Sequence, residues 1–169
     1  MAGLPASGKS AVSQALKQSL DAVLLDKDQV RAGLFTDHVD YTREQDDLCV
    51  DIMYNVAHYH LTNRPQTPVI LDGRTYSRRY QIDSVKRAAK RADTSIHIIE
   101  CVCSSETARM RLRQDKDKHI ARNRDELLYE KSRAAAEPIT EPRLVLDTEH
   151  LTKEQCALSA LDYIRKQQL

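Results

Sequence analysis

The sequence of 169 residues lacks tryptophan and contains one phenylalanine, four glycines and four cysteines. No apolar run approaches the ~20 residues that a membrane-spanning helix needs. The first residues do not follow the basic, apolar and small-residue order of a secretory signal. The cysteines form no CxxC pair and no zinc-finger spacing with histidine, which favours free thiols in a reducing compartment over zinc or disulfides. These absences predict a cytoplasmic protein with no membrane segment.

The composition predicts one globular domain that spans residues 1–169. Hydrophobic residues make up 41% of the chain, which is enough for a core, and charged residues make up 30%, which is typical of a solvated surface. The net charge of +1 gives no general reason to expect a nucleic acid partner. Nucleic acid binding is therefore open but not favoured, and the composition leaves the oligomeric state open.

Two of the four glycines, Gly3 and Gly8, belong to a stretch that matches the phosphate-binding pattern GxxxxGK[ST]. Backbone amides of such a loop cradle nucleotide phosphates, and the helix that follows adds the positive end of its dipole. Lys9 would reach the β- and γ-phosphates of ATP, and the Ser10 hydroxyl would bind Mg²⁺. The residues predicted to contact ATP in this loop are Gly3, Leu4, Pro5, Ala6, Ser7, Gly8, Lys9 and Ser10.

Strand and helix patterns alternate along the chain. This alternation predicts an α/β fold of the P-loop nucleoside triphosphate hydrolase type, a three-layer sandwich with a parallel sheet and a helical lid. On the helix expected from 42 to 61, Leu48, Ile52 and Val56 are spaced as a buried stripe. The remaining expected elements are strands at 22–25, 69–71, 96–102 and 144–146, and helices at 10–20, around 82–89 and from 152 onward.

The strand before the phosphate-binding loop is the one departure from this pattern. Only Met1 and Ala2 precede Gly3, whereas strands usually run about five to six residues. We expect a truncated first strand, because the true start lies upstream of Met1 or because the chain lacks a strand that its fold needs.

Asp28 and Arg31 follow the expected strand 22–25 at a spacing that places them on one helix face. A carboxylate there could accept the proton of an attacking hydroxyl, and a guanidinium could hold an anionic group of the substrate. Alternatively, Asp26 or Asp28 is a helix cap and Arg31 its solvated partner. The carboxyl end of a parallel strand is where crevices form, which favours the functional interpretation of Asp28.

Asp72 ends the expected strand 69–71, where an acid could hold Mg²⁺ or substrate. It could instead only stabilise the turn at Gly73. Arg74 and Arg78 follow, and both are candidates for the acceptor pocket, although exposed helix arginines are common.

A basic segment lies between two helical patterns. Residues 109–133 hold nine basic and five acidic residues, a net charge of +4. This excess favours a lid at about 113–124 that covers ATP and neutralises charge during transfer. Arg113, Arg122 and Arg124 are the candidate arginines, with Arg113 assigned to catalysis and ATP binding. The alternative is a solvated helical hairpin with ordinary ion pairs.

Four segments occur in the order found in one kinase group: GLPASGKS, LLDKDQVRAGLF, VILDGRTYSRR and IIECVCSSETARMRLR. From Gly3 to Thr148 the chain resembles the P-loop small kinases, which include adenylylsulfate kinases, the kinase domain of polynucleotide kinases and gluconate-type kinases. The resemblance implies that Asp28 is the base, that Arg31 contacts the substrate and that the loop at Asp147 borders the adenine.

The motifs together predict an enzyme that uses ATP and Mg²⁺ to phosphorylate a hydroxyl of a small-molecule metabolite. A guanine-reading N-K-x-D motif is missing, which argues against a GTPase. Three alternatives stay open: a polynucleotide 5′-hydroxyl kinase, a toxin-like nucleotide-sugar kinase and a non-catalytic ATP-binding regulator. The scarcity of aromatic residues for base stacking disfavours the polynucleotide substrate.

Overall fold

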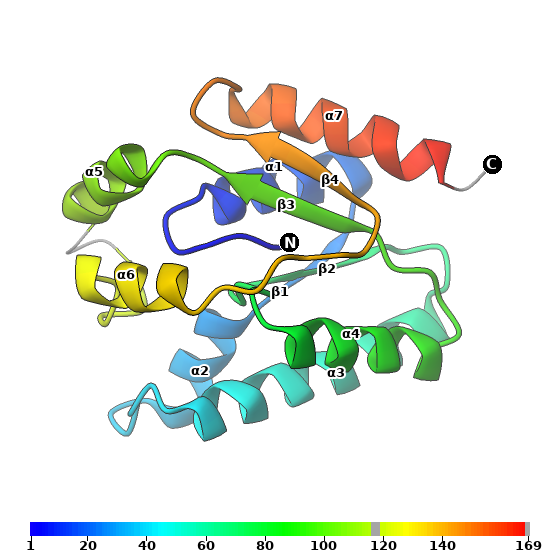
Figure 1. Ribbon diagram of the computed structural model, residues 1–169. Helices are drawn as coiled ribbons and strands as arrows, with labels where there is room; N and C mark the ends of the chain where they lie inside the picture. Colours follow the sequence, from blue (N-terminus) through cyan, green and yellow to red (C-terminus); the bar gives the residue numbers. More distant parts are fainter. Residues whose placement is uncertain (116–118, 168–169) are drawn as a thin grey trace.

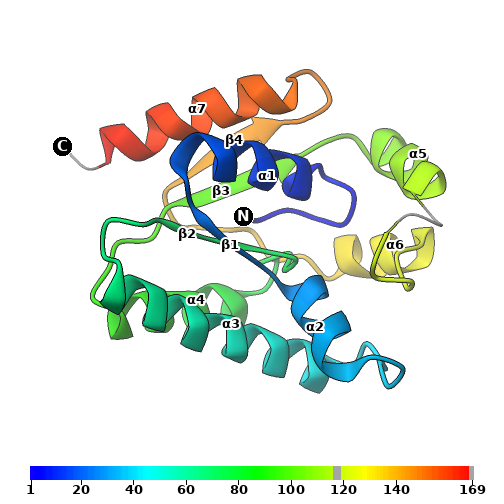
Figure 2. The ribbon, with the colours of Figure 1, turned by 180° about the vertical axis from the view of Figure 1, so that it is seen from behind.

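The computed structural model describes residues 1–115 and 119–167, in which helices cover both faces of parallel strands. Helices α1 and α7 lie on one face and α3 and α4 on the other, while α2, α5 and α6 gather at one end (Figure 1; Figure 2). This confirms the predicted α/β sandwich. The elements are α1 Lys9–Leu20, β1 Val23–Asp26, α2 Lys27–Phe35, α3 Arg43–Asn63, β2 Val69–Asp72, α4 Arg79–Arg91, β3 Ile98–Val102, α5 Ser105–Asp115, α6 Glu126–Ala134, β4 Arg143–Asp147 and α7 Lys153–Lys166.

The strands form two parallel pairs, β1 with β2 and β3 with β4. Met1 and Ala2 lie between the pairs. The Met1 amine donates a hydrogen bond to the Leu71 carbonyl of β2 at 2.8 Å. On the other side, the Ala2 N–H donates to the Ile99 carbonyl of β3 at 2.7 Å. The two residues before the phosphate-binding loop thus occupy the centre of the sheet, and this central strand is as short as predicted.

A cavity of about 620 Å³ continues from Met1 between the two strand pairs. Leu16 and Leu161 line it from the α1 and α7 layer, and Tyr54 and Ile82 line it from the α3 and α4 layer. Because both helical layers face the cavity, it passes through the plane of the sheet. It lies where a longer central strand would run.

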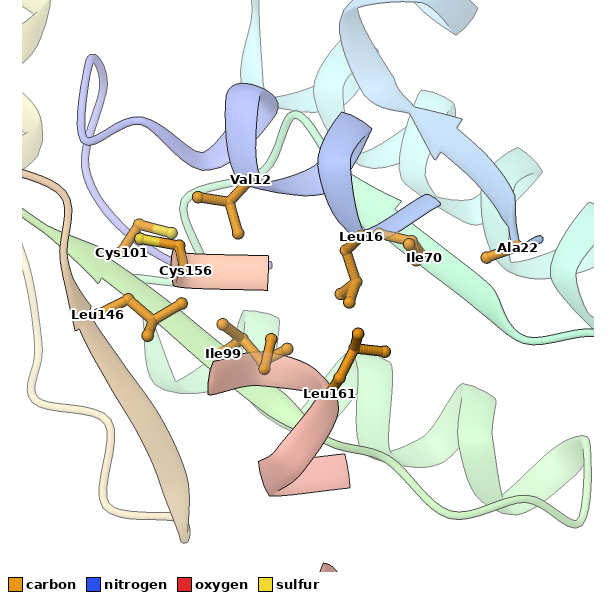
Figure 3. Packing of buried hydrophobic residues seen from close by; sticks show 10 residues of the cluster. Val12, Leu16, Ala22, Ile70, Ile99, Cys101, Leu146, Cys156 and Leu161 are labelled. Carbon is orange, nitrogen blue, oxygen red and sulfur yellow. The ribbon is translucent and has the colours of Figure 1, made fainter. Parts of the chain in front are cut away.

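The main core lies between α1, α7 and the sheet (Figure 3). Val12 and Leu16 of α1 are spaced one helical turn apart, so both point at the strands. Cys101 and Cys156 are fully buried in this core, and the free thiols predicted from the sequence are found at all four cysteines. No helix of the described residues is both long and apolar enough to cross a bilayer.

The buried stripe predicted for α3 is wrong. Leu48 is 51% and Val56 37% exposed, whereas Cys49, Met53 and Ala57 are buried. The helix carries apolar side chains on two adjacent stripes, and the second stripe packs inward. This rotation lets the acidic pair at residues 46–47 reach two buried arginines, as described below.

Candidate active site

The phosphate-binding loop has the backbone that its glycines predict. Gly8 ends the loop with a φ of 83° and caps α1, and Gly3 has a φ of 131°. These values lie in or beyond the left-handed region that glycine tolerates best. A Cβ at Gly3 would overlap the Cys101 carbonyl oxygen, and one at Gly8 would lie 2.9 Å from Thr148 Oγ1. Both positions therefore require glycine for close packing as well as for φ.

Lys9 lies folded over the loop. Its Nζ donates hydrogen bonds to the carbonyl oxygens of Gly3 at 2.8 Å and Leu4 at 2.9 Å. Burial lowers the pKa of Lys9, while the negative charges of Asp72 and, more weakly, Asp28 act in the opposite direction. Ser10 is exposed on the first turn of α1. The loop thus presents one exposed hydroxyl and one buried cation on which the charges of two carboxylates act.

Thr148 and Arg111 hold the outer side of the loop. The Thr148 hydroxyl donates to the Ser7 carbonyl at 2.9 Å. Arg111 Nη1 donates to the Ala6 carbonyl at 3.2 Å and to Thr148 Oγ1 at 2.9 Å. Sequence reasoning did not select Arg111 as a site residue. The strongest available clue was its place in the basic segment, which does not distinguish it from its neighbours.

Asp28 and Arg31 meet as the sequence predicts. Asp26 caps α2 by accepting a hydrogen bond from the Asp28 N–H at 2.8 Å, and the Asp28 carboxylate lies in the first turn of the helix. Arg31 is 3% exposed and its Nη1 donates to Asp28 Oδ1 at 2.8 Å. Arg31 Nη2 also contacts Asp46 of α3. Its Nε is buried and has no hydrogen-bond partner among the described residues, so one donor of this guanidinium is unsatisfied.

Lys27 lies between the same carboxylates. Its Nζ is 3.0 Å from Asp46 Oδ2 and 3.6 Å from Asp28 Oδ1. Burial lowers the pKa of Lys27 to about 8, and the Asp28 carboxylate partly opposes that effect. This lysine was not predicted as a site residue, because nothing in its spacing sets it apart.

Arg74 forms a second buried cation on the same side. It is 6% exposed and pairs with Asp47 of α3, and it donates to the Tyr80 hydroxyl at 3.2 Å. Its guanidinium also lies over the Tyr80 ring, 5.4 Å from the centroid. Such stacking leaves the polar edge of a guanidinium available for hydrogen bonds. Arg74 follows the end of β2 and Arg31 lies on α2, which follows β1, and acidic residues of α3 hold both arginines.

Asp72 ends β2 beside Asp26, its register partner at the end of β1. Asp72 is 1% exposed, and its Oδ1 has no hydrogen-bond partner among the described residues. An unsatisfied buried carboxylate oxygen is costly unless a cation or a donor joins it. Mg²⁺ in kinases binds one or two protein oxygens together with phosphates, and Asp72 and Ser10 fit that donor set. The described residues contain no cluster of three or more histidine, cysteine or acidic side chains for a metal held by protein alone.

The remaining predicted residues are spread more widely. Arg113 is exposed and its Nε donates to Glu126 at 2.7 Å. Arg124 is half-buried; burial lowers its pKa, and the charge of Asp28 is the largest opposing influence. Asp147 is bonded to His150 at the exposed end of β4. For Arg78, no side-chain contact to Asp28 or to the loop is found within residues 1–115 and 119–167. Residues 116–118 of the predicted lid lie outside the described residues.

The fold and the arrangement of the phosphate-binding loop define a P-loop kinase-like protein. A family model described as an AAA domain matches residues 1–139, and the chain belongs to this family. No curated protein sequence gives a significant match. The resemblance to P-loop small kinases noted in the sequence is therefore confirmed at the level of family and fold.

Several solved structures share this fold. Mycobacterium tuberculosis APS kinase CysC, in complex with AMPPNP and APS, is 18% identical with a TM-score of 0.70 over 97% of this chain and 94% of that chain. A gluconokinase from Sinorhizobium meliloti 1021 is 16% identical with a TM-score of 0.63 over 98% and 94%. Chaetomium thermophilum Kti12, in complex with ADP-AlF3, is 17% identical with a TM-score of 0.69 over 98% and 95%. At these identities, the likeness establishes the fold.

Proposed function

We propose that this protein is a kinase that transfers the γ-phosphate of ATP to a hydroxyl of a small molecule. The observation that carries the proposal is a phosphate-binding loop with Lys9 bonded to its carbonyls, together with the paired ends of β1 and β2, where Asp72 lies and where α2 begins with the Asp28–Arg31 pair. The described residues thus supply a phosphate-binding cation, a buried carboxylate with an unsatisfied oxygen and a candidate base paired with an arginine. Nucleotides bound to APS kinase and Kti12 support ATP as the donor.

In this proposal different residues bind the phosphates, bind the acceptor and accept the proton. The loop amides and Lys9 hold the β- and γ-phosphates, and Arg31 and Arg74 hold the acceptor through their remaining donors. The acceptor oxygen attacks the γ-phosphorus, the bond to the β–γ bridging oxygen breaks, ADP leaves, and Asp28 takes the hydroxyl proton. Mg²⁺, held by Ser10 and by Asp72 directly or through water, would neutralise phosphate charge when bound.

Among the predicted arginines, we assign Arg124 as the cation that balances charge during transfer, because it is half-buried and the carboxylate of Asp28 acts on its charge. The roles predicted for Arg113, Arg78 and Asp147 stay predictions, without a contact to the loop or to Asp28 that would support them. Thr148 and Arg111 join the proposed nucleotide site, because they fix the carbonyls of Ser7 and Ala6 and so the shape of the loop.

A screen for transfer of labelled γ-phosphate tests the proposal. Purified protein is incubated with MgATP and pools of sugars, polyols, nucleosides, nucleotide sugars and 5′-hydroxyl oligonucleotides. A labelled product from a metabolite pool supports the proposed class, while a labelled oligonucleotide or nucleotide sugar identifies one of the alternative acceptors. Lys9→Ala should abolish labelling in every pool.

A nucleotide-dependent regulator without an acceptor is the second candidate. The likeness to Kti12, which was solved with ADP-AlF3 and is not named a kinase, favours it. This candidate predicts MgATP binding that Lys9→Ala removes and no labelled product in any pool. Calorimetry with MgAMPPNP, run beside the screen, separates it from the kinase.

A further inference from the structure

Tyr41 is an unusual residue in the loop between α2 and α3. Its φ is 56°, a left-handed backbone that a bulky aromatic side chain rarely adopts and that persists only where surrounding contacts enforce it. Neither the sequence patterns nor the proposed chemistry uses this residue. The contacts of its side chain show what holds it in place.

The Tyr41 side chain makes contacts in two directions. Its ring lies against Arg31, with the guanidinium carbon 5.1 Å from the ring centroid. Its hydroxyl oxygen accepts a hydrogen bond at 2.9 Å from the backbone N–H of Arg122, which is 81 residues away in the sequence. One side chain therefore joins a buried arginine of the acceptor side to the segment 119–125 that precedes α6.

The segment 119–125 carries Arg124 near the carboxylates at the ends of β1 and β2. This arginine is half-buried, and the carboxylates of Asp28, Asp72 and Asp26 all act on its charge. Two residues earlier, Arg122 donates its backbone N–H to Tyr41. A shift of this backbone would carry Arg124 away from Asp28, because only Asn123 lies between the two arginines.

We propose that Tyr41 is a positioning residue that couples Arg31, on the acceptor side, to the placement of the backbone that carries Arg124. The ring orients the Arg31 guanidinium, and the hydroxyl fixes the backbone at Arg122. The proposal rests on the proposed kinase function, because it assigns Arg124 to the charge that develops during phosphoryl transfer. It adds a residue whose effect is confined to the transition state and leaves nucleotide binding unchanged.

The test compares the binding of MgADP with that of MgADP plus aluminium fluoride, which imitates the transferring phosphoryl group. In the unmodified protein the fluoride complex should bind more tightly. Tyr41→Phe keeps the ring on Arg31 and removes the hydroxyl acceptor. The ratio measured is the Kd of MgADP divided by the Kd of MgADP with aluminium fluoride. Loss of one such hydrogen bond predicts about a tenfold fall in this ratio. The Kd of MgADP itself should stay unchanged within about twofold.

Two control variants match this change. Tyr59→Phe removes the hydroxyl of a tyrosine on α3 that is 66% exposed, and should leave the ratio unchanged. Arg122→Ala keeps the backbone N–H that donates to the Tyr41 hydroxyl, and it tests whether the side chain of Arg122, itself a candidate lid arginine, carries the effect instead. A fall of the ratio in Arg122→Ala as large as that in Tyr41→Phe would assign the effect to the Arg122 side chain and overturn the proposal.

A second readout follows the segment directly. The chain has no tryptophan, so an I120W substitution at the exposed Ile120 provides a single fluorescent reporter. Adding aluminium fluoride to the MgADP complex should change its emission, and Tyr41→Phe should reduce that change. Equal ratios and equal emission in both proteins would overturn the coupling alone. Absence of MgADP binding in the unmodified protein would overturn the proposed function and the coupling with it.

Discussion

The cavity in the centre of the sheet leads to a prediction about stability. An apolar tetrapeptide such as Leu-Ile-Val-Leu, fused before Met1, should continue the central strand through the cavity. The Leu71 carbonyl accepts the hydrogen bond of the Met1 amine. Peptide groups alternate sides along a strand, so the Val69 carbonyl, two residues earlier, points to the same side. On the other side, the Ile99 carbonyl of β3 accepts a hydrogen bond from the Ala2 N–H. The added residues would pair with both strands.

The expected gain follows from the walls of the cavity. Because both helical layers line it, alternate side chains on either face of the new strand would be buried, each contributing about 2 kcal/mol. Roughly four ladder hydrogen bonds add about 1 kcal/mol each. Ordering the backbone costs about 1.5 kcal/mol per residue and ordering the side chains about 0.7 kcal/mol each. The net stabilisation is about 3 kcal/mol, or about 10 °C in Tm for a chain of this size.

The gain should also depend on pH. Burial lowers the pKa of the Met1 amine from its usual value of 8.0. Because the folded amine resists protonation, the unextended chain loses stability as the pH falls below about 8, where the unfolded amine takes up a proton. Extension converts the amine to an amide and removes this loss, so the stabilisation should be larger at pH 6 than at pH 9.

Thermal and urea unfolding at the two pH values measure the effect. The matched control is a Gly-Ser-Gly-Ser extension, which also removes the terminal charge but has no apolar side chains for the cavity. It should share the pH-dependent part of the gain and lack the rest. Equal Tm values for the apolar and the Gly-Ser extension would refute the argument that the cavity accepts a strand.

Three further predictions concern the site. Gly8→Ala, which requires a φ of 83° and approaches Thr148, should lower the free energy of unfolding by about 1–3 kcal/mol; urea unfolding checks this, and an unchanged midpoint would contradict it. Arg111→Ala should weaken MgAMPPNP binding about tenfold by freeing the carbonyls that Arg111 holds, whereas Arg109→Ala, at an exposed ion pair, should leave the calorimetric Kd unchanged. The buried Lys27 amine, with its pKa lowered to about 8, makes the folded state gain stability from pH 8 to 10.5 at about 1 kcal/mol per pH unit; Lys27→Met should remove this slope, and parallel slopes in the two proteins would contradict the assignment.

Local patterns predicted the elements of this fold well. The phosphate-binding loop, the helix cap at Asp26 and the ends of the four strands depend on residues that are neighbours in the sequence. The capping box of α7, Thr152 with Gln155, is likewise complete. By contrast, the inward face of α3 depends on its rotation against the sheet. This helix carries two adjacent apolar stripes, and periodicity alone cannot tell which of them faces the sheet. The prediction chose the stripe with Leu48 and Val56, which is exposed.

Contacts across long sequence separations explain what the sequence could not predict about the site. Arg111 contacts the loop residue Ala6 over 105 positions, and Thr148 contacts Ser7 over 141. The partners of the two buried arginines, Asp46 and Asp47, come from another helix. Spacing rules relate residues on one element only. They found the Asp28–Arg31 pair for that reason and gave no criterion for choosing among the basic residues from 109 to 133.

The rate of γ-phosphate transfer by Asp28→Asn, measured with the acceptor pool that gives the highest labelling, tests the central claim most directly. The control is Asp51→Asn, at an exposed position on α3. The proposed chemistry predicts a fall in transfer of roughly 100-fold or more in Asp28→Asn, MgAMPPNP affinity within about twofold of the unmodified protein, and full activity of the control. Transfer at the unmodified rate by Asp28→Asn would contradict the assignment of this carboxylate as the base.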